Sequence, residues 1–352
     1  MTQICYVKTP FNEGVVDVCS TLKQTFNPLF WARGGVSQTF LQQMIPCGNN
    51  RYSREIFAFS DGVETSLDWK YAKNIRTAPI IVCLHGLGGD SGSNYLKIFT
   101  NYCQKVGYTT VVYNRRGHGG GSLLPKVGLI ENASCVFPRH VNMTDMKEVV
   151  DYICKKWPNQ QKYLVGFSCG ANLAINYLAE VGISSPFVSS IAVCNGYNIL
   201  ELTKTNKYFN KIATGFLKDM LLARLKECQL IAQKKEFKID WKAAKRAKSI
   251  QDFERCFVES YGHESLESYY EKDSSHNKLH LIKKPILCIQ NRSDPFVPES
   301  MNCFPAEAAK ENPNIFYVET ESGGHLGWIE NVFETPWYMK LMIEYFNLQP
   351  KG

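Results

Sequence analysis

Residues 166–170, Gly-Phe-Ser-Cys-Gly, place a serine between two glycines where the pattern of the sequence changes. The apolar run at 161–167 is typical of a buried strand, and the pattern at 169–180 is typical of a helix. A Gly-x-Ser-x-Gly motif at such a junction forms a tight turn that exposes the serine hydroxyl at the carboxyl edge of a sheet. Such a serine can attack an acyl carbonyl and form a covalent acyl-enzyme. Ser168 is therefore the predicted nucleophile, and a chance occurrence of a five-residue pattern is the alternative.

A serine hydroxyl needs a base, and His325 is the histidine best placed to supply one. It follows the last apolar run, at 314–320, directly after two glycines that let a loop aim the ring. A carboxylate must hold the imidazole in the correct tautomer, and Asp294 follows the apolar run at 284–291. The order Ser, Asp, His is typical of hydrolases built on an α/β sheet. The alternatives are an ordinary loop histidine and an aspartate that forms a turn before Pro295.

The negative charge that develops on an attacked carbonyl needs two backbone donors. The N–H of Cys169, directly after the nucleophile, is one candidate. The N–H of Leu87, in the glycine-rich sequence Leu-His-Gly-Leu-Gly-Gly-Asp at 84–90, is the other. This loop lacks the Gly-Lys-Ser/Thr ending of a phosphate-binding loop and the spacing of a dinucleotide fingerprint, so no nucleotide cofactor is expected. A serine nucleophile also disfavours epoxide hydrolase or dehalogenase chemistry, which uses a carboxylate.

The elements that would position these residues alternate between strand and helix patterns. Two extended runs, 54–60 and 64–72, flank Asp61-Gly62 and predict a hairpin. Short apolar runs typical of strands buried on both faces follow at 78–86, 108–117, 161–168, 188–196, 284–291 and 314–320. Apolar stripes at helical spacing lie at 145–157 and 339–346. The sequence therefore predicts an α/β fold of the α/β-hydrolase type, a mostly parallel twisted sheet with helices on both faces.

The interval from residue 198 to 280 is too long for a simple crossover and is mainly helical in pattern, which predicts a helical cap (lid) insertion. We expect residues 51–197 and 281–352 to form the core and residues 1–50 to be an N-terminal extension that packs on it. Positive charge gathers in the insertion, because residues 203–250 hold 13 Lys and Arg against 4 Asp and Glu. One interpretation is peripheral contact with an anionic membrane. The alternative is a solvated helix face, and no motif supports nucleic-acid binding.

The 13 cysteines form no Cys-x-x-Cys pair and lie largely in apolar runs, which is typical of reduced core thiols. No metal site is predicted. No signal peptide and no apolar run of about 18 residues is found, so we expect a cytoplasmic protein, with peripheral membrane contact as the variant.

His140 and Asp145 form a His-x4-Asp pattern that is seen in some acyltransferases. We favour a structural role for Asp145 in the first turn of the helix at 145–157, with Thr144 as its cap. Arg115 and Arg116 are expected to organise the loop after the fourth predicted strand.

Several motifs make the sequence similar to the AB hydrolase 4 family of the AB hydrolase superfamily, in the branch with mammalian abhydrolase-domain lipases and phospholipases and yeast ethanol acyltransferases. The resemblance runs from about residue 28 to 345. It is carried by YSREIFAFSDGVETSLDW, VVYNRRGHGGGSLL, GFSCGANLAINYL, AKSIQDFERCF, YGHESLESYYEKDSS and ENPNIFYVETESGGHLGWIE.

The resemblance implies that Ser168, Asp294 and His325 form a charge-relay system without a cofactor. It also implies esters of medium or long acyl chains, such as acylglycerols and phospholipids, as substrates. Acyl transfer to an alcohol with the same triad is the alternative, and a non-catalytic lipid-binding module is a further one. The family usually has an apolar or small residue where this sequence has Cys169.

Overall fold

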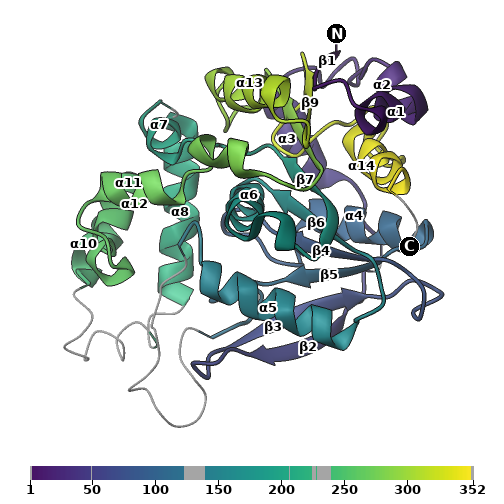
Figure 1. Ribbon diagram of the computed structural model, residues 1–352. Helices are drawn as coiled ribbons and strands as arrows, with labels where there is room; N and C mark the ends of the chain where they lie inside the picture. Colours follow the sequence, from purple (N-terminus) through teal and green to yellow (C-terminus); the bar gives the residue numbers. More distant parts are fainter. Residues whose placement is uncertain are drawn as a thin grey trace.

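A single mixed sheet runs through the molecule, with its strands in the order β1-β9-β8-β7-β6-β4-β5-β3-β2 (Figure 1). The computed structural model describes residues 2–48, 50–122, 139–205, 207–223, 227 and 239–349. The strands are β1 (Thr2–Cys5), β2 (Ser53–Ala58), β3 (Glu64–Lys70), β4 (Ile80–Leu84), β5 (Thr109–Tyr113), β6 (Lys162–Phe167), β7 (Phe187–Val193), β8 (Ile286–Asn291) and β9 (Ile315–Thr320).

The middle of the sheet is parallel and its edges are antiparallel. Strands β4 to β9 pair in parallel with their neighbours, while β2 pairs with β3, β3 with β5, and β1 with β9 in the antiparallel sense. The predicted hairpin is confirmed, because β2 and β3 meet at Asp61-Gly62, where Gly62 has a φ of 80° that suits glycine.

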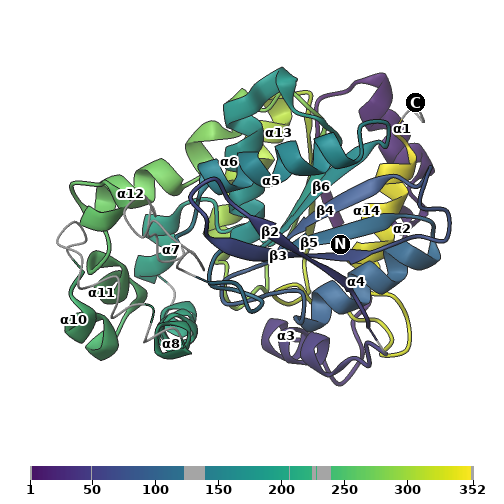
Figure 2. The ribbon, with the colours of Figure 1, turned by 90° about the horizontal axis from the view of Figure 1, so that it is seen from below.

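Helices cover both faces of the sheet, as the sequence predicts for strands that are apolar throughout. On one face lie α5 (Met143–Lys156), α6 (Cys169–Val181) and α13 (Cys303–Glu311), and on the other lie α4 (Asn94–Lys105) and α14 (Trp337–Asn347) (Figure 2). Every residue of β4, β5, β6, β8 and β9 is buried. The parallel strands all direct their carboxyl ends to one edge, where the candidate site residues lie.

The N-terminal segment contributes one strand and three helices. The helices are α1 (Pro10–Val18), α2 (Ser20–Lys23) and α3 (Gly35–Met44), and the side chains of Val15 and Leu41 join the buried cluster beneath α4 and α14. Strand β1 was not predicted from the sequence. It adds an outer strand to the sheet by pairing with β9, from Thr2 opposite Thr320 to Cys5 opposite Tyr317.

Between β7 and β8 the described residues are mainly helical. They form α7 (Ile199–Thr205), α8 (Lys207–Ala223), α10 (Trp241–Arg246), α11 (Ile250–Arg255) and α12 (Leu266–Asp273). Figures 1 and 2 show these helices grouped to one side of the sheet. The segment is not a loose appendage, since Leu217, Phe253 and Tyr269 belong to the same buried cluster as side chains of α5 and α6. The division of the chain into core, lid and extension remains a prediction.

None of the described helices is both long enough and apolar enough to cross a bilayer.

Candidate active site

Ser168 occupies a strained turn between β6 and α6. Its backbone has φ 55° and ψ −121°, a conformation that residues other than glycine rarely adopt. The two flanking glycines are required by the close approach of other backbone atoms. A Cβ on Gly166 would lie 2.3 Å from the carbonyl oxygen of Gly170, and one on Gly170 would lie 2.2 Å from that of Leu84. The turn therefore needs both glycines, and it raises the hydroxyl above the end of the sheet.

The structure brings together the three side chains that the sequence singled out. His325 Nε2 lies 2.9 Å from Ser168 Oγ, and His325 Nδ1 lies 2.9 Å from Asp294 Oδ2. The other carboxylate oxygen of Asp294 accepts backbone N–H bonds from Phe296 at 2.8 Å and Val297 at 3.0 Å. Because the carboxylate is fixed from the backbone, it fixes the ring in turn, with Nδ1 donating to Asp294 and Nε2 directed at the serine.

The N-terminal segment positions the loop that carries His325, which the sequence did not predict. Thr39 Oγ1, on α3, accepts the backbone N–H of His325 at 2.7 Å and donates to the carbonyl of Gly35 at 2.7 Å. Helix α3 reaches this loop because a glycine begins it. A Cβ on Gly35 would lie 3.2 Å from the carbonyl oxygen of Gly323 in this loop, and 1.6 Å from that of Ser293 in the neighbouring loop of Asp294. No local sequence signal marks Thr39, because the contact joins positions that are 286 residues apart.

The two backbone N–H groups predicted to bind the oxyanion are available to a substrate. Among the described residues, the backbone N–H groups of Leu87 and Cys169 make no hydrogen bond within the chain. The loop of Leu87 lies against the nucleophile, since a Cβ on Gly86 would lie 3.2 Å from Ser168 Cβ. On the other side of this loop, Phe216 of α8 fills the space at Gly88.

A neutral histidine holds this loop in place. His85 is fully buried, and its Nδ1 lies 2.8 Å from the carbonyl of Gly86 while its Nε2 accepts the N–H of Arg115 at 3.1 Å. Burial, and next the positive charge of Arg115, lowers the pKa of His85 well below its ordinary value. His85 therefore serves as an uncharged brace between two loops and not as a general base.

The side chains around Ser168 enclose a cavity of only about 20 Å³. Its lining includes the largely apolar side chains of Tyr197, Ile199, Leu202 and Val297 and the more polar side chains of His140, Cys169, Asn172 and Asn195. A volume of this size holds about one water molecule. An acyl chain must therefore displace the neighbouring side chains before its carbonyl can reach Ser168.

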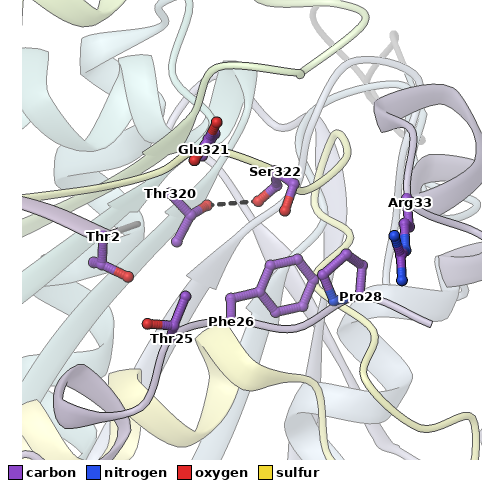
Figure 3. A pocket seen from close by; sticks show the side chains of 8 residues that line it. All are labelled: Thr2, Thr25, Phe26, Pro28, Arg33, Thr320, Glu321 and Ser322. Carbon is purple, nitrogen blue, oxygen red and sulfur yellow. Dashed lines mark hydrogen bonds between the residues drawn. The ribbon is translucent and has the colours of Figure 1, made fainter. Parts of the chain in front are cut away.

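A larger hollow of about 320 Å³ lies elsewhere and contains none of the predicted site residues. Figure 3 shows it between the end of β9, with Glu321 and Ser322, and the N-terminal segment that carries Phe26 and Pro28. Its size alone does not make it the active site, because no nucleophile and base face each other there.

The His-x4-Asp pattern does not form a pair. Asp145 accepts two hydrogen bonds from Arg116, at 2.6 and 2.8 Å, and His140 instead lies beside Glu254. The structural role expected for Asp145 and Arg116 is therefore confirmed. The expected cap is wrong, because Asn142 and not Thr144 accepts the N–H of Asp145 at the start of α5. Asn142 lies one residue before the first turn, so its carboxamide reaches the N–H that Thr144 cannot.

Comparison with known proteins identifies the family to which the chain belongs. Residues 79–332 match the family model described as the alpha/beta hydrolase fold, and the chain belongs to this family of hydrolases.

Curated relatives extend the match over most of the chain. It is 28% identical over 333 residues to Phospholipase ABHD3 of Mus musculus, which covers 92% of this chain and 78% of that protein. It is 27% identical over 368 residues to Monoacylglycerol lipase ABHD2 of Danio rerio, covering 96% of this chain and 83% of that protein. Among solved structures, the Pyrococcus furiosus esterase Pf2001 superposes with a TM-score of 0.53 at 19% identity, over 86% of this chain and 94% of that one. At that identity the superposition shows the shared fold alone.

Proposed function

We propose that the protein is a serine carboxylic-ester hydrolase that acts on medium- to long-chain acyl esters such as acylglycerols or phospholipids. The observation that carries the proposal is the hydrogen-bonded line from Ser168 through His325 to Asp294 on a strained strand-to-helix turn. The names of the relatives, a phospholipase and a monoacylglycerol lipase, support lipid esters as the substrate class.

In the proposed reaction Ser168 Oγ attacks the acyl carbonyl carbon while His325 Nε2 takes its proton. The carbonyl oxygen gains the negative charge and accepts hydrogen bonds from the N–H groups of Leu87 and Cys169. The imidazolium then protonates the departing alcohol, which leaves an acyl-enzyme on Ser168. A water molecule gives its proton to His325 and attacks the acyl carbon, and the proton returns to Ser168 as the fatty acid leaves.

The helices between β7 and β8 are proposed to act as a lid. Ile199 and Leu202 of α7 line the cavity beside Ser168, and Phe216 of α8 contacts the loop of Leu87. The cavity of about 20 Å³ is too small for a long acyl chain, so movement of these helices is needed to admit the substrate. The length of acyl chain accepted is therefore expected to depend on how far α7 and α8 move.

Peripheral membrane contact is proposed through the same segment. Helix α8 exposes Ile212, Phe216 and Leu222, which are 38%, 49% and 54% exposed, alongside the exposed Lys211 and the half-buried Lys218. Helix α3 lies on the same side of the molecule (Figure 2) and exposes Val36, Phe40 and Met44. Apolar side chains flanked by lysine suit the interface of an anionic bilayer. Lys234 and Lys235, which belong to the basic stretch at 203–250, lie outside the described residues.

The membrane proposal is tested by co-sedimentation with phosphatidylserine-containing vesicles. The double variant Ile212→Asp with Leu222→Asp is expected to bind at least about tenfold more weakly. It loses apolar area that the bilayer would bury, and it gains negative charge. Ile183→Asp is the matched control, since Ile183 is 70% exposed outside α3 and α8. Equal binding by all three proteins would contradict the proposal.

Hydrolysis is tested with a fluorescent fluorophosphonate and with p-nitrophenyl butyrate, octanoate and palmitate. Wild type is expected to be labelled and to turn over these esters, and Ser168→Ala to lose both. Ser184→Ala is the control, because Ser184 is exposed in the turn after α6. Turnover that persists in Ser168→Ala would overturn the assignment of the nucleophile. A folded wild type that is neither labelled nor active would favour a lipid-binding module.

Acyl transfer to an alcohol is the rival reaction with the same residues. Adding ethanol during turnover distinguishes the two, because transfer yields the ethyl ester and hydrolysis yields only the free acid.

A further inference from the structure

Directly beside Ser168, a second nucleophilic side chain faces the same cavity. Cys169 begins α6, is partly exposed, and lines the cavity of about 20 Å³ together with His140. Its place in the first turn of a 13-residue helix exposes the thiol to the positive end of the helix dipole. A thiol in such a position is stabilised as the thiolate, which is the reactive form.

His140 is held between Cys169 and a buried carboxylate. Its Nε2 lies 2.9 Å from Glu254 Oε1 of α11, and the two side chains are only 5% and 6% exposed. Tyr270 of α12 donates its hydroxyl proton to Glu254, and Tyr269 accepts the backbone N–H of His140. The imidazole is therefore placed with one nitrogen beside the carboxylate, and it lines the same cavity as Cys169. We call Cys169, His140 and Glu254 the Cys-His-Glu line.

The charges in this line favour an imidazolium and a thiolate. Burial alone would lower the pKa of His140, but the negative charge of Glu254 and the contact with Cys169 raise it well above its ordinary value. Burial alone would raise the pKa of Cys169, but the hydrogen bond and charge of His140, together with Arg115, hold it below its ordinary value.

Other groups that face the pair do not change this balance. Glu254 itself acts in the opposite sense on the thiol, and Asp273 of α12 adds a second carboxyl near His140. Burial raises the pKa of Asp273 to about 6, so it is partly protonated in weakly acidic solution.

We propose that Cys169 is a covalent modification site for small hydroperoxides such as hydrogen peroxide. The thiolate sulfur attacks one peroxide oxygen, an S–O bond forms and the O–O bond breaks. The departing hydroxide takes a proton from solvent and becomes water. The sulfur is oxidised to a sulfenic acid and the peroxide is reduced.

The location of the site gives the modification a consequence. An added oxygen atom occupies a cavity that holds about one water molecule, at the residue next to Ser168. It also changes the side chain of the residue whose N–H is proposed to hold the oxyanion. Modification is therefore expected to reduce ester turnover. Only this consequence rests on the proposed function, since the thiol chemistry does not require hydrolysis.

The test follows sulfenic acid formation in the intact chain by trapping with dimedone and peptide mass mapping between pH 6 and pH 9. Cys303 is the internal control, because it is the exposed cysteine of α13. Partial burial, and next the negative charge of Glu307, raises the pKa of its thiol. At pH 7 Cys169 is expected to be trapped at least about tenfold faster than Cys303, with a midpoint below the value of about 8.5 for a free thiol. Trapping of Cys169 no faster than Cys303 across the range would overturn the proposal.

Glu254→Gln keeps the shape of the side chain and removes the charge that holds His140 protonated. Its Cys169 is expected to be trapped about tenfold more slowly at pH 7 and to recover at higher pH. An unchanged rate in a folded variant would contradict the Cys-His-Glu line, and the wild-type pH profile decides the matter if the variant does not fold.

Turnover of p-nitrophenyl butyrate is measured in the same samples. Wild type is expected to lose activity in proportion to modified Cys169. Cys169→Ser, compared with its own untreated sample, is expected to lose none. Loss of activity by peroxide in Cys169→Ser equal to that of wild type would contradict the regulatory consequence and leave the mass measurement to decide the modification itself.

Discussion

Ser168 and Cys169 are adjacent in the chain, and each faces a histidine that contacts a carboxylate. Ser168 faces His325 and Asp294, which come from the loops after β9 and β8. Cys169 shares its cavity with His140, before α5, and His140 contacts Glu254, on a helix of the segment between β7 and β8. The first set therefore belongs to the sheet edge, whereas the second joins the sheet to the helical segment.

The two histidines are arranged for different tasks. His325 directs Nε2 at the hydroxyl of Ser168, the proposed nucleophile, and its side chain is 11% exposed at the cavity. His140 is almost fully buried against Glu254, which favours its charged form. A general base has to be neutral before it acts, and a partner for a thiolate has to be charged. The proposed roles of the two histidines thus differ with the position of the carboxylate and the degree of burial.

The largest effect is expected from the carboxylate of the serine set. Asp294→Asn leaves the geometry but no longer fixes the tautomer of His325, and kcat/KM for p-nitrophenyl butyrate is expected to fall by about 10⁴-fold, as for other triads. Glu254→Gln is expected to cost less than about tenfold in the same assay. Equal losses in the two variants would erase the distinction between the two histidines.

A smaller effect is expected from Asp273, the second carboxyl near His140. Burial raises the pKa of Asp273 from 3.8 to about 6, so the native state binds this proton more tightly than the unfolded chain does. The resulting contribution to the free energy of unfolding is full below about pH 4 and is lost as the pH rises through about 6. At 1.36 kcal/mol for each pKa unit, the difference amounts to about 3 kcal/mol.

Asp273→Asn removes this dependence while an amide oxygen can still accept the N–H of Val141. The free energy of unfolding in urea is measured for both proteins at pH 4.5 and pH 8. The difference, variant minus wild type, is expected to be more favourable to the variant at pH 8. A difference in unfolding free energy that stays constant over this range would show that Asp273 does not titrate in it.

The smallest effect is expected at Thr39, which acts on the serine set from outside. Thr39→Val leaves the N–H of His325 without its acceptor, at a cost of about 1–2 kcal/mol, or about tenfold in kcat. KM is expected to change little, because Thr39 does not line the cavity. Thr39→Ser retains the hydroxyl and is the matched control. A loss in Thr39→Ser as large as in Thr39→Val would assign the effect to packing instead of the hydrogen bond.

The sequence predicted the parts of the fold and site that depend on local pattern. The strand before Ser168 and the helix after it are strongly apolar, and the glycines between them leave one conformation for the turn. Asp294 and His325 each follow a buried strand, and parallel strands bring their carboxyl ends to one edge, so chain order was enough to single them out. The structure places these three side chains in hydrogen-bonding contact.

Contacts between distant segments could not be predicted in the same way. Strand β1 has only four residues and no fully buried face, so no alternation marks it. Thr39 and Glu254 lie in ordinary amphipathic helix patterns, and their partners are set by how those helices dock. His140 was noted for its spacing to Asp145, but the two side chains diverge to Glu254 and Arg116. Side chains that turn to different neighbours leave no periodic signal in the sequence.

The hydrogen bond between Thr39 and His325 has a consequence for biosynthesis. The two residues are separated by 286 positions, and a ribosome adding roughly 5–20 residues per second needs on the order of tens of seconds to make the second after the first. Ser168 is made well before that moment, whereas His325, the proposed base, lacks the support of Thr39 until the loop after β9 is made and meets α3. In the proposed mechanism, a growing polypeptide therefore holds the nucleophile before it holds a supported base, and competence for catalysis requires that the two ends of the fold have met.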